Sequence, residues 1–477
     1  MYGGDCVKKL GSVLINRNAK AGIVYLFGNL LTKFIAFITV PIFTRLMTTT
    51  EYGLVNTYMS WVSILSLLIG LSLGNSIRSA YIDYKNNLNE YISSMFFLSF
   101  INMLFVSILT FLVSTNIFKS IDSTLLVLCL IQSYSTFILA TVEMKYMVMF
   151  EYKKKTAISV LPNIIAPILA IVLLFSISYQ RVFLRIIPHV FVTLIIATVY
   201  FFSYVFKGRK LVNFEYWKYA LRFSIPLVFH GLSATVLATS DRTMITALRS
   251  ASETGVYSIV YNLSMIAMVA TKSLESVWIP WFNDKMEKGE KELINKTAKQ
   301  YIEIALIIML SILMIGPELL KLLAPEEYWG GTSLIAPILF ASFLIFLYSI
   351  SVDLEYYFKS TKIIAINTVI AAIVNILLNF IFIPKYGMYA AAYTTVIAYL
   401  IMFIIHYFSA RKLDSSLFPF KLYFPSLVVM VCAMLFLYLT KENYLFRWGI
   451  TLLAFLIYLI IINKTGRLKS IINIKRR

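Results

Sequence analysis

Four basic residues lie within or beside long apolar stretches, where a charged side chain is costly and tends to face a cavity or a charged partner. Lysine and arginine donate the hydrogen bonds that a phosphate or pyrophosphate accepts, and arginine can donate two at once. The sequence therefore predicts a cationic cavity that binds an anionic ligand group. The four candidate residues are Lys33, Arg78, Lys272 and Arg242.

Each of these residues also has a purely structural interpretation. Lys33, deep in its apolar stretch, could pair with an acid on a neighbouring helix, and Arg78 could anchor the cytoplasmic end of a span. Lys272 precedes Glu275 by three residues, a spacing that allows an ion pair on one helix. Arg242 could lie at the membrane interface. Both interpretations stand for each residue.

Two further residues are candidates for coupling transport to an ion. His230 lies in the middle of an apolar stretch, four residues after a proline that is expected to kink the helix. Its imidazole could exchange a proton, or it could be a hydrogen-bonded packing element. Asp353, with the nearby Glu355, is a candidate ion-coupling carboxylate, and the alternative is an ion pair with Lys359 or Lys362.

Motifs for catalysis are absent from the sequence. It contains neither the G-x-x-x-x-G-K-[ST] pattern of a nucleotide-binding loop nor the H-E-x-x-H pattern of a zinc enzyme. Its three cysteines, Cys6, Cys129 and Cys432, lie too far apart to suggest a disulfide framework or a metal site. We therefore expect no enzyme activity, no cofactor and no metal ion.

The composition is that of an integral membrane protein. Of 477 residues, 60% are hydrophobic and 14% are charged, and the mean hydropathy is +0.80; a soluble domain carries about 25% charged residues. The net charge of +20 could suggest nucleic acid, but the lysines and arginines lie in short loops between apolar segments. This distribution is typical of membrane topology, and no nucleic-acid partner is expected.

Apolar segments long enough to cross about 30 Å of hydrocarbon can be delimited along the whole chain. We predict an all-α membrane protein with about fourteen transmembrane helices. The predicted spans are 22–47, 54–75, 91–114, 123–147, 157–178, 185–206, 219–240, 255–279, 299–320, 332–354, 363–383, 388–408, 420–440 and 445–463.

The distribution of basic residues predicts the orientation in the membrane. Loops on the side of the N-terminus hold 31 lysines and arginines, the opposite loops hold 9, and three lie within spans. By the positive-inside rule both termini are cytoplasmic, as an even number of spans requires. Residues 1–21 are basic and lack a signal-peptide cleavage site, so 22–47 is predicted to be an uncleaved first span.

A short repeat suggests an internal duplication. Glu51-Tyr52-Gly53 leads into the second span, and Glu253-Thr254-Gly255 leads into the eighth, about 202 residues later. Because six spans separate the two copies, the halves would share one orientation and be related by an axis along the membrane normal. A match of so few residues is also compatible with chance.

Three stretches stand out along the chain: Pro41–Leu46 with Glu51–Gly53, Phe358–Lys362 leading to Asn367, and Asn375–Asn379 with Ile383–Gly387 and Ala390–Ala392. The third of them predicts a tight turn at Pro384 and Gly387 and close helix packing at the alanines that follow. Together the three stretches resemble the Wzx-type polysaccharide flippases of the multidrug/oligosaccharidyl-lipid/polysaccharide superfamily.

The resemblance implies two six-helix lobes around a central cavity, with two C-terminal helices appended. It also implies that a polyprenyl-pyrophosphate-linked oligosaccharide moves from the cytoplasmic to the outer leaflet of the cell membrane, with its pyrophosphate on the candidate cations. Expected partners are membrane lipids and, in the same biosynthesis, a polymerase and glycosyltransferases; a monomer is the expected state. The implied organisation is a cytoplasmic segment 1–21, an N-lobe 22–206, a linker 207–218, a C-lobe 219–408, two helices in 409–463 and a basic tail 464–477.

Two alternative functions stand beside the flippase. A multidrug or cation antiporter of the same superfamily would need a buried acid in its cavity, and the first span offers Lys33 instead. A membrane polysaccharide polymerase would need a large outer loop, whereas no predicted loop exceeds about twenty residues.

Overall fold

The computed structural model describes residues 28, 31–117, 122–440 and 442–464, and every regular element in them is helical. The predicted segment 1–21 and tail residues 465–477 lie outside the described part. After a helix over 31–46, the long helices are α2 (Thr49–Gly70), α4 (Leu88–Ile117), α5 (Ser123–Val148), α6 (Tyr152–Ser176), α7 (Arg181–Gly208), α8 (Phe214–Leu248), α9 (Ala251–Glu287), α10 (Lys291–Leu323), α11 (Ile335–Tyr357), α12 (Thr361–Leu413), α13 (Phe424–Thr440) and α14 (Tyr444–Lys464).

In the part of the chain that the structure describes, the predicted spans overlap these helices or one half of α12; residues 22–27 and 29–30 of the first predicted span lie outside the described part. Within the described residues, nine helices are long and apolar enough to cross a membrane, and α8 makes a tenth if its two bent pieces form one span. Helix α12 contains two predicted spans, and α13 and α14 supply shorter apolar helices. The protein is therefore a multi-pass membrane protein, and its helices are compatible with fourteen spans.

The chain divides into two compact units. Unit 1 comprises residues 1–258, 323–328 and 362–394, and unit 2 comprises 259–322, 329–361 and 395–477. The boundaries fall inside α9 and α12, so both helices contribute to both units. The lobe limits proposed from the sequence stay a prediction.

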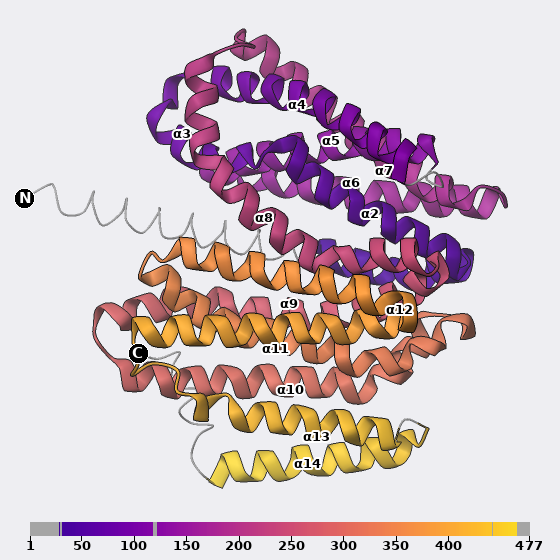
Figure 1. The fold of residues 1–477 in the computed structure, drawn as a ribbon, viewed down its shortest axis with the longest axis vertical. Helices are drawn as coiled ribbons and strands as arrows, with labels where there is room; N and C mark the ends of the chain where they lie inside the picture. Colours follow the sequence, from indigo (N-terminus) through magenta and orange to yellow (C-terminus); the bar gives the residue numbers. More distant parts are fainter. Residues whose placement is uncertain (1–27, 29–30, 118–121, 441, 465–477) are drawn as a thin grey trace, which may run out of the picture. The chain divides into compact units, whose positions relative to one another are not determined.

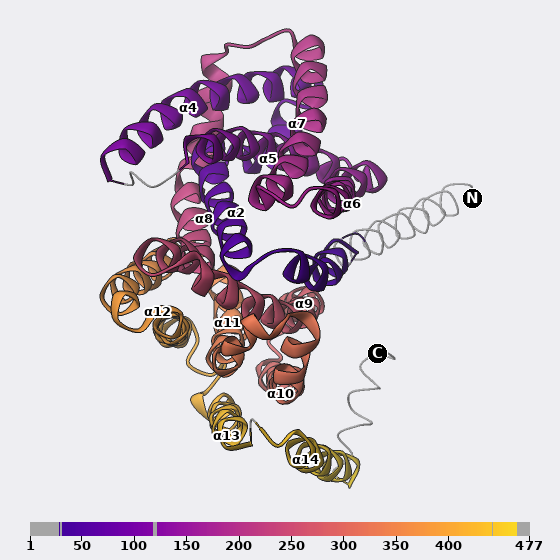
Figure 2. The ribbon, with the colours of Figure 1, turned by 90° about the vertical axis from the view of Figure 1, so that its right-hand side faces the viewer.

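Unit 1 is built around helix α5. This helix packs against α2, α6 and α7, and α2 runs beside α8 (Figure 1 and Figure 2). Its core is rich in buried aromatic side chains, among them Tyr91, Phe96 and Tyr204. Aromatic rings fill the space between helices and prefer the edge-to-face contacts seen between Phe96 and Tyr204.

A short helix, α3 (Ile77–Asp83), lies between two 3₁₀ turns (Leu73–Ser76 and Lys85–Asn87) and connects α2 to α4. Two hydrogen bonds attach it to α8: Tyr219 donates to Asp83 over 2.5 Å, and Tyr84 donates to Glu215 over 3.2 Å. Burial, and then the neighbouring Glu215 carboxylate, raises the pKa of Tyr84, so this phenol keeps its proton and continues to donate.

The duplicated motifs start two helices in the same way and then contact each other. Thr48 caps α2 by accepting a hydrogen bond from the Glu51 amide over 3.2 Å, and Ser250, 202 residues later, accepts one from the Glu253 amide over 3.2 Å. The two helix starts then cross at their glycines. A Cβ atom on Gly53 would lie 1.7 Å from the carbonyl oxygen of Ala251.

The same contact occurs in the reverse direction. A Cβ atom on Gly255 would lie 2.1 Å from the carbonyl oxygen of Thr49. Since Ala251 and Gly255 stand 202 residues after Thr49 and Gly53, the two copies make reciprocal contacts, as a pseudo-twofold relation requires. This symmetry in space supports a duplication beyond the few matching letters.

The turn predicted at Pro384 and Gly387 is confirmed. Helix α12 breaks at Gly387, whose φ of 58° and ψ of −139° suit glycine alone. The repeat residue Glu253 fastens this break, because its carboxylate accepts a hydrogen bond from the Met388 amide over 2.8 Å. Arg249 pairs with Glu253 over 3.2 Å and also donates to the Pro384 carbonyl.

A bend also interrupts α8 where the sequence predicts a proline kink. The pieces Phe214–Ile225 and Leu227–Leu248 meet at 46° on either side of Pro226. A proline cannot donate the helical hydrogen bond and clashes with the preceding turn, which accounts for the bend.

Unit 2 contains the C-terminal pair α13 and α14, which pack side by side (Figure 2, yellow). A buried arginine, Arg447, fixes their connection. It donates to the carbonyl oxygens of Met314 and Thr440 over 2.9 and 3.0 Å and pairs with Glu318. The count of basic residues by loop placed Arg447 in an outer loop. Its side chain is instead buried and ion-paired within the protein.

Candidate functional site

Lys33 and Arg78, the first two candidate cations, keep exposed side chains in unit 1. Lys33 lies on the helix over 31–46, and neither residue has a carboxylate within ion-pair distance among the described residues. Arg78 lies on α3 and donates to the sulfur of Met144 over 3.4 Å, a weak contact that leaves its charge uncompensated. Both residues are available to an anionic ligand.

Lys272 is compensated, as its structural interpretation anticipated. Its ammonium lies 2.6 Å from the Glu275 carboxylate on the next turn of α9. Lys272 and Glu275 both act electrostatically on Asp353 of α11, so these three residues form a mixed-charge group in unit 2. An anion would have to compete with two carboxylates for Lys272, which makes it the weaker binding candidate.

Arg242 and its neighbour Asp241 lie inside helix α8 and not at its end. Helix α8 continues to Leu248, and the exposed fractions of Arg242 and Asp241 are only 9% and 2%. Asp241 accepts hydrogen bonds from Tyr257 of α9 and from Asn379 of α12, each over 2.7 Å. The helix extends two turns beyond the predicted end of the span, so both side chains are buried within the protein, and the interfacial interpretation of Arg242 stays a prediction.

Asp241 is the centre of a larger buried polar cluster. Asn379 also donates to Asn375 over 3.2 Å, and Thr394 donates to Asn379. The cluster joins α8, α9 and α12 through Ser240, Asp241, Tyr257, Asn375, Asn379 and Thr394. Its carboxylate, amide and hydroxyl oxygens are the ligand types of hard cations, but both oxygens of Asp241 are occupied by donors in this structure.

The sequence did not predict this cluster: Asn375 and Asn379 were singled out only as part of the family-like motif. The spacing of Asn375 and Asn379 was the available signal, because amides one turn apart on an apolar helix need polar partners.

No group of three or more histidine, cysteine or acidic side chains within the described residues could hold a metal ion.

The candidate coupling residues lie in separate units. His230 is partly exposed on α8 of unit 1, and Asp353 belongs to the mixed-charge group of unit 2. Glu355 does not pair with Lys359 or Lys362 as predicted. Its carboxylate instead lies 2.8 Å from Nδ1 of His406, on the second half of α12.

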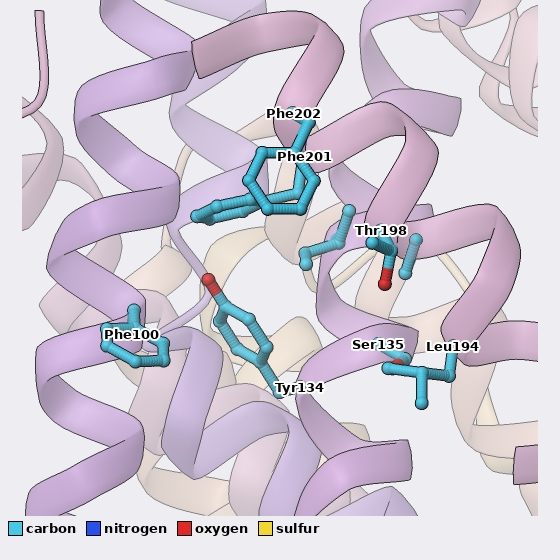
Figure 3. A pocket seen from close by; sticks show the side chains of 9 residues that line it. Phe100, Tyr134, Ser135, Leu194, Thr198, Phe201 and Phe202 are labelled. Atoms are coloured by element: carbon cyan, nitrogen blue, oxygen red, sulfur yellow. The ribbon is translucent and has the colours of Figure 1, made fainter.

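A small pocket of about 130 Å³ opens between α4, α5 and α7 in unit 1 (Figure 3). Its lining is mainly apolar, and the hydroxyl of Tyr134 is engaged with the Phe96 carbonyl over 2.9 Å. An apolar lining offers few hydrogen bonds to sugar hydroxyls, so the pocket is not a candidate site for a sugar headgroup. Its residues are Phe100, Tyr134, Ser135, Ile138, Leu194, Ala197, Thr198, Phe201 and Phe202.

Comparison with known proteins decides the family. Residues 19–286, more than half of the chain, match the model of the polysaccharide biosynthesis protein family. The chain belongs to this family. The capsular polysaccharide biosynthesis protein CapF of Staphylococcus aureus is 25% identical over 414 residues, which cover 82% of this chain and 98% of CapF. The Lsg locus putative protein 1 of Haemophilus influenzae is 22% identical over 75% of this chain and 89% of its own.

Solved structures identify the fold. The lipid II flippase MurJ, in an inward closed conformation, superposes with a TM-score of 0.69 at 16% identity, over 94% of this chain and 99% of MurJ. An inward-facing multidrug resistance transporter of the MATE family gives a TM-score of 0.61 at 13% identity, over 80% and 95%. This member of the polysaccharide biosynthesis family therefore shares the fold of these two transporters.

Proposed function

We propose that this protein flips a polyprenyl-pyrophosphate-linked oligosaccharide from the inner to the outer leaflet of the cell membrane. The observation that carries the proposal is the combination of a polysaccharide biosynthesis family match with a fold similar to that of a lipid II flippase. The substrate supplies a surface polysaccharide of the capsule or O-antigen type. A glycosyltransferase makes the oligosaccharide, and a polymerase consumes it on the outer side.

Lys33 and Arg78 hold the pyrophosphate in this proposal. Their charges are exposed and lack an ion-pair partner among the described residues, whereas Lys272 is neutralised by Glu275. Arg78 also lies on a helix that two hydrogen bonds fasten to α8, so its position is defined before the ligand arrives. The excess of basic loops supports cytoplasmic termini, and alternating access by the two lobes moves the headgroup.

The antiporter alternative gains one observation. Such a transporter needs a buried acid, and Asp241 is one. Both of its oxygens accept hydrogen bonds here, so a cation would have to displace Tyr257 or Asn379. This requirement disfavours Asp241 as the receptor of an organic cation.

Reconstitution tests the proposed function directly. The purified protein is inserted into liposomes that contain a fluorescent polyprenyl-pyrophosphate disaccharide, and a membrane-impermeant quencher reports how much lipid changes leaflet. Crossing that requires the protein is expected. If saccharide lipids of different composition do not cross under any proton or sodium gradient, while an organic cation is exported, the antiporter replaces the flippase.

A further inference from the structure

The pair formed by Glu355 and His406 has no role in the proposed binding of substrate, yet its chemistry is distinctive. Glu355 lies on α11 and His406 on α12, and both side chains are completely buried in unit 2. The carboxylate oxygen Oε2 lies 2.8 Å from the imidazole Nδ1. The Tyr348 ring stacks on the imidazole at 5.6 Å between centroids and 19° between planes.

The charges around the pair do not neutralise Glu355. Across the described chain, His406 is the basic side chain within ion-pair distance of this carboxylate, and its other oxygen, Oε1, accepts no hydrogen bond from a described residue. On α11, Tyr356 acts on Glu355 electrostatically, and Asp353 adds negative charge two residues away. Lys272 of α9, which acts electrostatically on Asp353, is already paired with Glu275.

Phenols also face this region. Tyr399 stacks on Tyr348 at 6.4 Å, and Tyr423, the residue before α13, contacts Tyr407, the residue after His406. Phenols carry no charge at neutral pH. Glu355 therefore depends on the proton of His406, or on a proton of its own, for neutrality.

We propose that Glu355 and His406 form a proton-binding site whose single exchangeable proton is released only when unit 2 opens to water. With that proton the pair is neutral overall, either as imidazolium and carboxylate or as imidazole and carboxylic acid. Loss of the proton to water leaves one net negative charge. A buried charge without a partner costs several kcal/mol, so the proton stays bound until water reaches the pair.

This coupling makes pH a control on the conformational cycle. At low pH the proton returns quickly and favours the closed state, whereas at high pH the deprotonated, hydrated state accumulates. The consequence for transport rests on the proposed function, but the binding of the proton does not.

The first test measures proton binding on the purified full-length protein without any substrate. Infrared difference spectra are recorded while the pH is changed, for wild type, Glu355→Gln and His406→Gln. The expected result is a carboxyl and imidazole signal that is present in wild type and lost in both variants. Glu143→Gln is the matched control. It changes a carboxylate on α5 that pairs with Lys155 at 3.9 Å, and it should keep the signal of the Glu355–His406 pair.

Identical spectra in wild type and in folded Glu355→Gln would overturn the proposal, whatever the protein transports. The second test follows the flipping rate as a function of pH. One proton predicts a rate that changes up to tenfold per pH unit on one side of the profile, and less than twofold in Glu355→Gln. A rate that falls equally at every pH in both variants would assign the pair a structural role and also overturn the proposal.

Discussion

Replacing Gly53 by alanine should separate α2 from α9. The new Cβ atom would lie 1.7 Å from the Ala251 carbonyl oxygen, and real Cβ contacts stay above 3.0 Å, so the two backbones must move apart by at least 1.3 Å. That movement also stretches the hydrogen bond between the two helices beside the crossing, Thr49 to Ser252 at 2.8 Å.

The expected cost follows from these losses. Overpacking of a tight contact costs about 1–3 kcal/mol, and an interhelical hydrogen bond in a membrane protein contributes about 0.6 kcal/mol. Together they predict a destabilisation of about 2–4 kcal/mol, measured by thermal unfolding of the detergent-purified protein. Gly255→Ala should behave alike, because it makes the reciprocal contact.

Gly449→Ala is the matched control for this experiment. A Cβ atom at Gly449 of α14 meets no atom within 4 Å, so alanine there should be neutral or stabilise by up to about 1 kcal/mol. If Gly53→Ala were as stable as Gly449→Ala, the backbone contact between the duplicated motifs would be refuted.

Two further predictions concern buried polar contacts. Asp241→Asn replaces an acceptor by an amide that cannot accept from both Tyr257 and Asn379, and it should cost about 1–3 kcal/mol of unfolding free energy; an unchanged melting temperature would contradict the described cluster. Asp414 is partly buried, which opposes ionisation, but hydrogen bonds from Lys291 and Ser416 outweigh this and lower its pKa. Because the folded pKa lies below the unfolded one of about 3.9, the stabilisation is present above that pH and is lost as the pH falls through the folded pKa. Asp414→Asn should therefore melt lower than wild type at pH 7, by about 1 kcal/mol, and the difference should shrink as the pH falls and vanish below the folded pKa; a difference independent of pH would contradict this assignment.

The sequence predicted the membrane spans well because each is a near-continuous apolar run, and hydropathy alone defines such a run. It also predicted the break at Gly387 and offered the pairing of Lys272 with Glu275 as one of two interpretations. Both features are local: the first needs a positive φ, and the second needs only the three-residue spacing of a helix.

Contacts between distant residues could not be predicted in this way. The predicted span before Asp241 ended at residue 240. A charged pair beside an apolar run gives the same sequence pattern whether it lies at a membrane interface or in a buried network. Glu355 and His406 are 51 residues apart, and nothing in either local pattern indicates that α11 presents one to the other. Whether Lys33 and Arg78 bind a ligand also stays a prediction from charge and exposure.

The flipping rate of the double variant Lys33→Ala/Arg78→Ala tests the central claim most directly. The variant is compared in liposomes with wild type and with Lys421→Ala/Arg209→Ala, which removes one exposed lysine and one exposed arginine elsewhere. A cationic site for pyrophosphate predicts that crossing of the saccharide lipid falls at least tenfold in the first variant and stays within twofold of wild type in the second. Equal crossing by the two inserted variants would contradict the assignment of pyrophosphate binding to Lys33 and Arg78.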